Sequence, residues 1–414
     1  MIRERKENQR GALHSLWFDP EEIKEEKMVY MDNAATTYPK PESVYYAMNE
    51  ANRCLSVNAG RGSYQLAQVA VEGMDALRTE LLRFIYADNQ AEVVFTPSAT
   101  IACNQIIGGR MLSKQDRVYV SPFEHNAVMR TLWKKQQECG FSIEEIPIDE
   151  KTLEIDLEKM KYVFLQKPPT YVFLSHVSNV TGYILPVEEI FNIAKEVTNR
   201  EAYVILDAAQ SFGLVEMDYR KTPFDAIVFA GHKTLYGPFG AAGFIKKDNF
   251  NLNSYLAGGT GSASLELRMP EEIPIGLEPG SPNIVAIVGL YAGLQFIKEE
   301  TREHIFEHEK TVSDAIIEGL KNIKGVKLYL PEHLEKHIGI ISFSVEGYRA
   351  DEIGMILDED YQIAVRTGYH CTPLLHKYLK DEVCGGTVRA SVGWFSDENN
   401  VEQLVNAIRE IVEG

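Results

Sequence analysis

The chain has 414 residues, of which 45% are hydrophobic and 25% are charged, so a wholly disordered protein is excluded and about two or three domains are expected. Its 42 lysine and arginine residues stand against 60 aspartate and glutamate residues, giving a formal net charge of −18. Because proteins bind phosphate groups through lysine and arginine, this balance argues against a nucleic-acid partner and against an anionic membrane.

The N-terminal residues, the longest uncharged run and the cysteines indicate the cellular environment in which the protein is expected to act. Residues 1–29 are polar and highly charged, lack the apolar core of a secretory signal, and are expected to form a solvated arm. The longest uncharged run, 279–297, is apolar only over 284–297, which favours a buried helix over a membrane span. Five sparse cysteines without a Cys-x-x-Cys pair predict neither a disulfide framework nor a structural zinc site, and they favour a reducing, cytoplasmic setting.

Short runs rich in Val, Ile, Phe and Tyr alternate with longer helical stretches between residues 91 and 244. The runs are 92–95, 117–120, 171–174, 203–206 and 226–229. Because they are apolar on both faces, they are expected to be buried strands of a mostly parallel sheet with helices on both sides. The sequence therefore predicts a large α/β domain over residues 30–299, whose first segment could pack with a smaller C-terminal domain.

The chain from residue 300 to 414 has a different pattern and is expected to form a smaller α+β domain. Strands are expected at 339–345, 362–365 and 388–394, with a helix at 350–357. Apolar residues recur at helical spacing from Val401 to Val412, which predicts a last helix capped by Ser396.

Polar residues follow each of the five predicted strands of the large domain, where ligands bind in open α/β sheets. Each one alone has an ordinary structural explanation, such as a helix cap, a turn residue or a solvent-exposed lysine. Together at one sheet edge they indicate a functional site. They are Thr96, Thr100, His125, Asn179, Asp207, Gln210, His232 and Lys233.

The residue types at this edge select the chemistry. A metal site would need several histidines or carboxylates, and neither a Walker loop nor a nucleophile elbow occurs, so no metal is expected. Pyridoxal phosphate (PLP) needs a lysine for a Schiff base, a carboxylate for its pyridine nitrogen, and a helix N-terminus with hydroxyls for its phosphate. Lys233, Asp207 and the segment 96–100 could supply these groups.

Three motifs are specific: Asp207-Ala-Ala-Gln210, Gly231-His-Lys233 and Arg366-Thr-Gly-Tyr-His-Cys371. Weaker ones, in order, are Tyr30-Met-Asp-Asn-Ala-Ala-Thr-Thr37, Asn58-Ala-Gly-Arg-Gly62, Glu124-His-Asn126, His176-Val-Ser-Asn-Val-Thr-Gly182, Glu278-Pro-Gly-Ser-Pro-Asn283 and Val388-Arg-Ala-Ser391. From residue 30 onward the sequence thus resembles the class V aminotransferase-like PLP enzymes, most closely the branch of cysteine desulfurases and selenocysteine lyases.

The resemblance implies the type I fold of PLP-dependent transferases and a homodimer. It implies that Lys233 bonds the cofactor and moves protons, that Asp207 pairs with the pyridine nitrogen, and that His125 stacks on the ring. It also implies that Cys371 accepts the sulfur. The other implied roles are cofactor contacts by Gln210, Asn179, Thr100, His232 and Ser281 of the partner subunit, and substrate contacts by Arg389, Arg366, Asn179 and Ala34.

Cys371 also has a physical argument of its own. A thiol moves sulfur as a thiolate, which Arg366 and His370 could favour, and the Gly, Thr and Pro around it predict a loop. Two residues depart from the branch: Ala230 stands where Ser or Thr is usual, and Tyr369 stands where His is common.

The sequence predicts a PLP-dependent cysteine desulfurase that converts L-cysteine to L-alanine and leaves a persulfide on Cys371 for an acceptor protein. Three alternatives stay open: a selenocysteine lyase, a β-eliminating C–S lyase that needs no acceptor cysteine, and a non-catalytic PLP-binding scaffold. The intact set of Lys233, Asp207, His125 and Arg389 argues against the scaffold.

Overall fold

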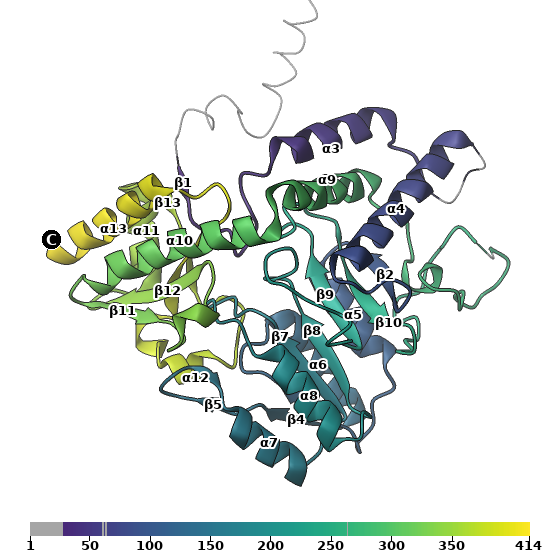
Figure 1. Cartoon of the computed structure of the whole chain (residues 1–414), viewed down its shortest axis with the longest axis horizontal. Helices are drawn as coiled ribbons and strands as arrows, with labels where there is room; N and C mark the ends of the chain where they lie inside the picture. Colours follow the sequence, from purple (N-terminus) through teal and green to yellow (C-terminus); the bar gives the residue numbers. More distant parts are fainter. Residues whose placement is uncertain (1–27, 60–61, 63, 263) are drawn as a thin grey trace, which may run out of the picture.

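The computed structural model describes residues 28–59, 62, 64–262 and 264–414, so the predicted arm lies almost entirely outside the described residues. The described chain contains a seven-stranded sheet in the order β2-β10-β9-β8-β7-β3-β4 (Figure 1). Its strands are β2 (Ala91–Thr96), β3 (Arg117–Val120), β4 (Ser142–Glu145), β7 (Tyr171–Ser175), β8 (Tyr203–Asp207), β9 (Ala226–Ala230) and β10 (Ala242–Lys247). A short pair, β5 (Ile148–Asp149) and β6 (Glu154–Ile155), stands apart from it.

Six of these seven strands run in one direction. β10 is antiparallel to both of its neighbours, and the other described pairs in this sheet are parallel. The five predicted strands are therefore confirmed, and their carboxyl ends meet at one edge of the sheet. β10 was not predicted, because its sequence Ala-Gly-Phe-Ile-Lys-Lys lacks a long apolar run.

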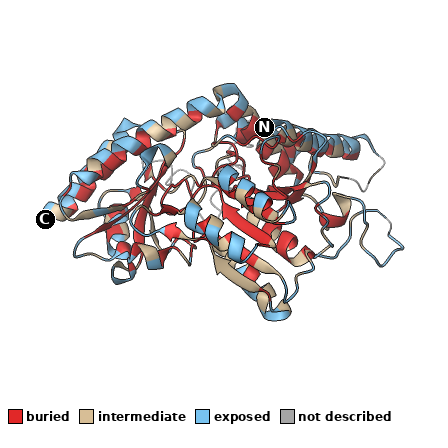
Figure 2. Cartoon of the chain, turned by 60° about the horizontal axis from the view of Figure 1, so that its bottom comes forward, coloured by how far each residue is buried: buried red, intermediate tan, exposed pale blue. Residues whose placement is uncertain are grey.

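Helices cover both faces of this sheet, as expected of an α/β fold (Figure 2). α5 and α6 pack on one face, while α4, α7, α8 and α9 bury their apolar sides in the core on the other. The apolar stretch predicted at 284–297 forms the buried helix α9. The helices of this part are α3 (Glu42–Cys54), α4 (Gln65–Phe84), α5 (Ala99–Gly109), α6 (Asn126–Cys139), α7 (Leu157–Gln166), α8 (Val187–Val197), η1 (Ile275–Leu277) and α9 (Ile284–Glu300).

The C-terminal part has an antiparallel sheet in the order β11-β12-β15-β14. The strand expected at 362–365 is present only over Ile363–Ala364, as β13, and a separate short strand, β14, begins at Arg366. The elements are α10 (Arg302–Lys321), β11 (Val326–Tyr329), η2 (Leu334–Lys336), β12 (Ile340–Val345), α11 (Ala350–Glu359), β13 (Ile363–Ala364), β14 (Arg366–Gly368), α12 (His376–Leu379), η3 (Glu382–Cys384), β15 (Thr387–Ser391) and α13 (Glu398–Glu413).

The last helix is present as predicted, but its cap is one residue later. The Asp397 carboxylate accepts a hydrogen bond from Asn400 N at 2.9 Å, while the Ser396 hydroxyl accepts one from Gly393 N. A carboxylate accepts more strongly than a hydroxyl and complements the helix dipole.

The two parts of the chain are joined at several points. β1 (Val29–Tyr30) pairs in parallel with β13, and Val29 and Met31 lie in the C-terminal core. Helix α10 extends from α9 to the C-terminal sheet (Figure 1) and contributes Ile305 to the core of the large sheet and Val312 to the smaller core. The division at residue 300 stays a prediction. Within the described residues, we find no helix with the length and apolar character needed to cross a membrane.

Candidate active site

Asp207 and Lys233 lie at the carboxyl ends of the neighbouring strands β8 and β9. Burial, together with the positive charges of Arg389 and Arg366, lowers the pKa of the Lys233 amine to about 8, although the Asp207 carboxylate acts in the opposite direction. Burial raises the pKa of Asp207, against a hydrogen bond of 3.0 Å from Ala209 N to its Oδ1. A buried amine with such a pKa is a usable nucleophile and base near neutral pH.

His125 caps the N-terminus of α6 just beyond β3. Its Nδ1 accepts a hydrogen bond from Ala127 N at 3.0 Å. Burial and the charges of Lys233, Arg366 and Arg389 lower the pKa of His125 to about 4, so its ring is neutral. A neutral, fixed imidazole is suited to stack on a flat cofactor ring without adding charge.

The end of β2 and the turn before Lys233 offer groups for an anion. α5 begins after Ser98, whose hydroxyl accepts from Ile101 N at 3.3 Å, and Thr100 is exposed in its first turn. The His232 ring stacks on Phe239 with 4.6 Å between centroids, and its Nδ1 is buried without a partner in the described chain. Burial and nearby lysines lower the pKa of His232 to about 3. A neutral, unsatisfied ring nitrogen and a helix N-terminus fit a phosphate group.

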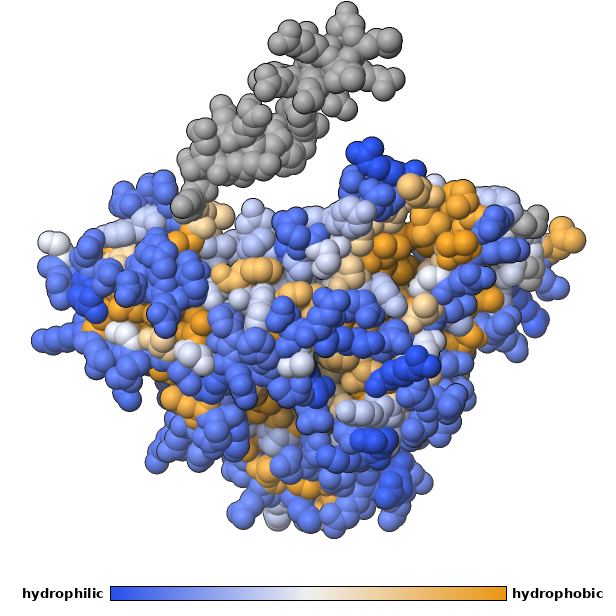
Figure 3. All heavy atoms as spheres, turned by 45° about the horizontal axis from the view of Figure 1, so that its top comes forward, coloured by the Kyte–Doolittle hydropathy of each residue, from blue (hydrophilic) through white to orange (hydrophobic). Residues whose placement is uncertain are grey.

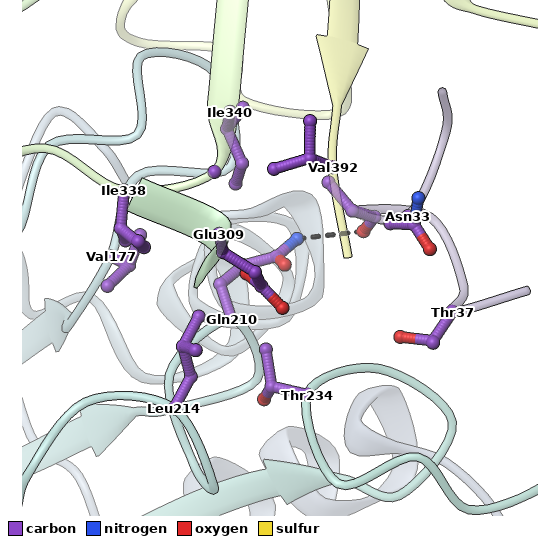
Figure 4. A pocket seen from close by; sticks show the side chains of 12 residues that line it. Asn33, Thr37, Val177, Gln210, Leu214, Thr234, Glu309, Ile338, Ile340 and Val392 are labelled. Carbon is purple, nitrogen blue, oxygen red and sulfur yellow. Dashed lines mark hydrogen bonds between the residues drawn. The ribbon is translucent and has the colours of Figure 1, made fainter. Parts of the chain in front are cut away.

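Figure 4 shows a small cavity beside this edge of the sheet. Gln210 Nε2 donates to Ala34 O at 2.8 Å, which ties the first described segment to the large sheet. Burial raises the pKa of Glu309, on α10, to about 8, and the Tyr236 hydroxyl donates to its Oε1 at 3.1 Å. The other labelled lining residues are Asn33, Thr37, Val177, Leu214, Thr234, Ile338, Ile340 and Val392.

The turn that carries Cys371 is anchored on the edge of the large sheet. Asn126 N donates to Cys371 O at 2.7 Å. Asn179 Nδ2 donates to His370 O, and Thr372 Oγ1 donates to Asn179 Oδ1, both at 2.7 Å. The loop predicted around Cys371 is thus present, and it brings the half-buried thiol to the side chains that follow β3 and β7.

Arg366 and His370 behave differently towards the thiol. Arg366 Nη2 lies 3.4 Å from Cys371 Sγ, which fits the expected electrostatic support of a thiolate. His370 turns away: its Nε2 lies 2.9 Å from Thr387 Oγ1 and 3.1 Å from Thr387 O. Burial and nearby cations hold the pKa of His370 well below its ordinary value, so this neutral ring supplies no positive charge to the thiol, contrary to the expectation.

Arg389 is fully buried and held by two partners. Its Nη1 donates to Asn179 O at 2.9 Å, and its Nη2 donates to Asp32 Oδ1 at 2.7 Å. Its Nε has no partner among the described residues. Arg366 stands directly opposite Arg389 across β14 and β15, so the two guanidinium groups lie on neighbouring strands. Two adjacent cations with unused N–H groups can bind a carboxylate.

Two carboxyl groups of this region, those of Asp32 and Glu124, were not predicted as site residues. Asp32 lies in a quoted motif, but its pairing with Arg389 spans 357 residues and leaves no local signal. Glu124 precedes His125 and is fully buried; Ser121 Oγ and Ser175 N donate to its Oε1. Burial raises the pKa of Glu124 to about 8. The signal available for it was its place in the quoted motif Glu124-His-Asn126, four residues after the end of β3.

Two predicted residues, Thr100 and Ser281, lie at the surface of the single chain. The Ser281 hydroxyl accepts a hydrogen bond from Asn58 Nδ2 at 3.1 Å and borders a cavity of about 540 Å³ that Arg78 and Thr96 also line. Their roles in binding phosphate stay predictions.

A family model for class-V aminotransferases matches residues 29–404, and the chain belongs to this family, whose enzymes depend on PLP. A probable cysteine desulfurase of Pyrococcus abyssi is 32% identical over 95% of this chain and 98% of its own length. The one of Methanothermobacter thermautotrophicus is 31% identical over 92% of this chain and 94% of its own.

Solved structures agree with the fold. The apo structure of the cysteine desulfurase of Thermococcus onnurineus superposes with a TM-score of 0.86 at 31% identity, covering 95% of this chain and 98% of the other. A cysteine desulfurase of Escherichia coli gives 0.79 at 24% identity, covering 93% and 95%, which supports the fold alone. The predicted family and the type I PLP fold are therefore confirmed.

Proposed function

We propose that this chain is a PLP-dependent cysteine desulfurase. L-Cysteine and the Cys371 thiol would yield L-alanine and a Cys371 persulfide, a balanced exchange that needs no external oxidant. The observation that carries the proposal is the position of Cys371, whose carbonyl is bonded to Asn126 beside His125. A lyase that releases sulfide directly has no need of a thiol there. The relatives named as cysteine desulfurases support the same activity.

PLP fits the residues of the site. Lys233 would bond it, Asp207 would face its pyridine nitrogen, and His125 would cover its ring. When bound, PLP supplies an electron sink for bonds broken at the substrate Cα. Other proposed cofactor contacts are Gln210, Asn179, Thr100 and His232. The structural support is the buried Nδ1 of His232, which has no partner among the described residues, and the lowered pKa of Lys233.

The substrate steps follow from the charges. Arg389 and Arg366 would hold the substrate carboxylate, near Asn179 and Ala34. Lys233, with a pKa of about 8, is suited to take a proton from the substrate Cα and to return one. The Cys371 thiolate, stabilised electrostatically by Arg366, would form a bond to the substrate sulfur. The Cβ–S bond would break with its electron pair on carbon, which takes up a proton to give alanine.

We also propose a homodimer in which Ser281 of the partner subunit completes the phosphate site. Figure 3 shows apolar side chains gathered on the part of the surface near α4, where Leu66 and Val69 are exposed. Burial of such a surface would stabilise a dimer. The acceptor of the persulfide would be another protein, and the free cysteines of the described chain suit work in a reducing cytoplasm.

The test replaces one thiol at a time. Cys371→Ser should release almost no alanine and carry no persulfide, whereas Cys384→Ser, a matched change at another half-buried free cysteine, should behave like wild type. Mass spectrometry of the products and of the protein measures alanine release and the persulfide. Pyruvate release that survives Cys371→Ser would overturn the proposal in favour of a C–S lyase. Selenide release from selenocysteine that survives it, without desulfuration of cysteine, would favour a selenocysteine lyase.

A further inference from the structure

A buried histidine and carboxylate stand next to the Cys371 turn. His376 opens α12, and its Nδ1 lies 2.6 Å from Asp381 Oδ2 while its Nε2 lies 2.8 Å from Tyr369 O. The exposed fractions of the His376 and Asp381 side chains are 7% and 0%. Neither residue belongs to the proposed chemistry, and neither was singled out by the sequence as a site residue.

The hydrogen-bond partners of the His376 ring determine which of its nitrogens carry hydrogen. A carbonyl oxygen only accepts, so His376 Nε2 must carry the hydrogen that it donates to Tyr369 O. The contact between Nδ1 and Asp381 Oδ2 holds a second hydrogen. The other carboxylate oxygen, Asp381 Oδ1, is buried and has no partner in the described chain. Asp381 therefore has one side-chain partner here, His376, whose ring it fixes in the orientation that reaches Tyr369.

The Tyr369 carbonyl begins a turn that needs support. His370 and Cys371 both have left-handed backbone conformations, with φ of 47° and 60°. Two successive non-glycine residues keep such a conformation only when their surroundings hold it. Asn179 and Asn126 hold the carbonyls of His370 and Cys371 from the large sheet. The carbonyl of Tyr369 is held by His376 and by Thr372 N at 3.1 Å.

We propose that His376 and Asp381 are positioning residues for the Cys371 thiol. The inference rests on the proposed role of Cys371 as sulfur acceptor. A thiol on a loosened turn spends less time in line with the substrate sulfur, so the transfer step slows. Within the described chain, neither His376 nor Asp381 hydrogen-bonds to Arg389 or Arg366, so binding of the substrate carboxylate should be unaffected. The Tyr369 ring packs edge-on against His376 with 4.9 Å between centroids. Tyr369, which stands where His is common in this branch, therefore has a structural role.

The test uses variants of the pair in the holoenzyme. His376→Phe keeps an aromatic ring but cannot donate, so kcat should fall roughly tenfold to a hundredfold while KM for cysteine stays within about twofold. Alkylation of Cys371 by iodoacetamide should change in rate as well. The matched control is His333→Phe, which breaks a histidine–carboxylate contact of 2.9 Å with Glu154 away from the turn and should leave all three values unchanged.

A second pair of variants separates hydrogen bonding from packing. In Asp381→Asn the amide can donate to His376 Nδ1 while Nε2 still donates to Tyr369 O, so this variant should retain far more kcat than Asp381→Leu. Equal kcat values in Asp381→Asn and Asp381→Leu would overturn the proposal. This comparison remains decisive if His376→Phe fails to fold. Wild-type kcat and alkylation in His376→Phe would overturn it too, even with Cys371→Ser inactive. Alanine release that survives Cys371→Ser would instead refute the proposed function.

Discussion

The ion pair between Arg389 and Asp32 allows a sharp test of the proposed substrate site. Arg389→Ala removes the donor to Asp32 Oδ1 at 2.7 Å and the donor to Asn179 O at 2.9 Å. It should weaken binding of cysteine, because the guanidinium group that would hold the substrate carboxylate is lost. It should also destabilise the fold, because the Asp32 carboxylate is left without its cation.

The loss of stability and the rise in KM expected for Arg389→Ala can both be calculated approximately. Removing one partner of a buried ion pair costs about 3–5 kcal/mol, and the Asp32 side chain is 22% exposed, so a loss near 3 kcal/mol is expected. Charge-assisted hydrogen bonds contribute about 1.5–3 kcal/mol, which corresponds to a rise in KM of about 10- to 150-fold. The double variant Asp32→Asn/Arg389→Ala carries no unpaired charge and should lose less stability than the sum of the single changes.

Urea unfolding of the four proteins measures the stability cycle, and initial rates measure KM for cysteine. The double variant should regain stability but keep the high KM, because restoring the charge balance does not restore a carboxylate-binding group. A wild-type KM in Arg389→Ala would refute the assignment and leave Arg366 as the carboxylate-binding residue. Strictly additive losses of stability would refute the role of Asp32 as the charge partner.

Three further outcomes are expected. Lys233→Ala should lose the borohydride-reducible attachment of PLP, and in wild type the rate of attachment should rise with pH and level off above about 8, because the free amine is the reactive form. Burial raises the pKa of Glu309 to about 8 in the folded state, so this carboxyl alone should lower stability by at most about 1.4 kcal/mol per pH unit between about pH 4.5 and 8, and urea unfolding of Glu309→Gln should show a pH slope smaller than that of wild type by this amount. Sedimentation should show a dimer; a monomer with full cofactor occupancy would refute the role of Ser281 of the partner subunit.

The large sheet and its functional edge were predictable because the signals are local. Each of the five predicted strands contains at least three consecutive apolar residues, and their shared direction follows from the crossover connections between them, most of which are helical. β10 escaped prediction because its apolar run is short and ends at Lys246, which is buried; the Lys246 amine donates to Glu92 on the neighbouring strand at 2.8 Å and to two backbone carbonyls. A sequence pattern does not show which distant carboxylate will neutralise a buried lysine.

Prediction of the site is limited in the same way, because a local sequence pattern does not show contacts between residues far apart in the chain. Lys233 and Asp207 each follow a strand, so their meeting follows from the topology of the sheet. The pair of Asp32 with Arg389 and the anchoring of the Cys371 turn by Asn179 join residues 191 or more positions apart. Those contacts depend on how the C-terminal sheet sits against the large one, which no local periodicity encodes.

The charges of the site explain how a protein of net charge −18 could bind anions. Lys233, Arg366 and Arg389 bring three cationic groups together, and Asp207 and Asp32 are the carboxylates that face them. The histidines add no charge, because burial and the nearby cations hold the pKa of His125 near 4 and that of His232 near 3. A phosphate and a substrate carboxylate would supply the negative charges that these cations lack. Local charge at the sheet edge, rather than the net charge of the surface, therefore determines which ligand the site favours.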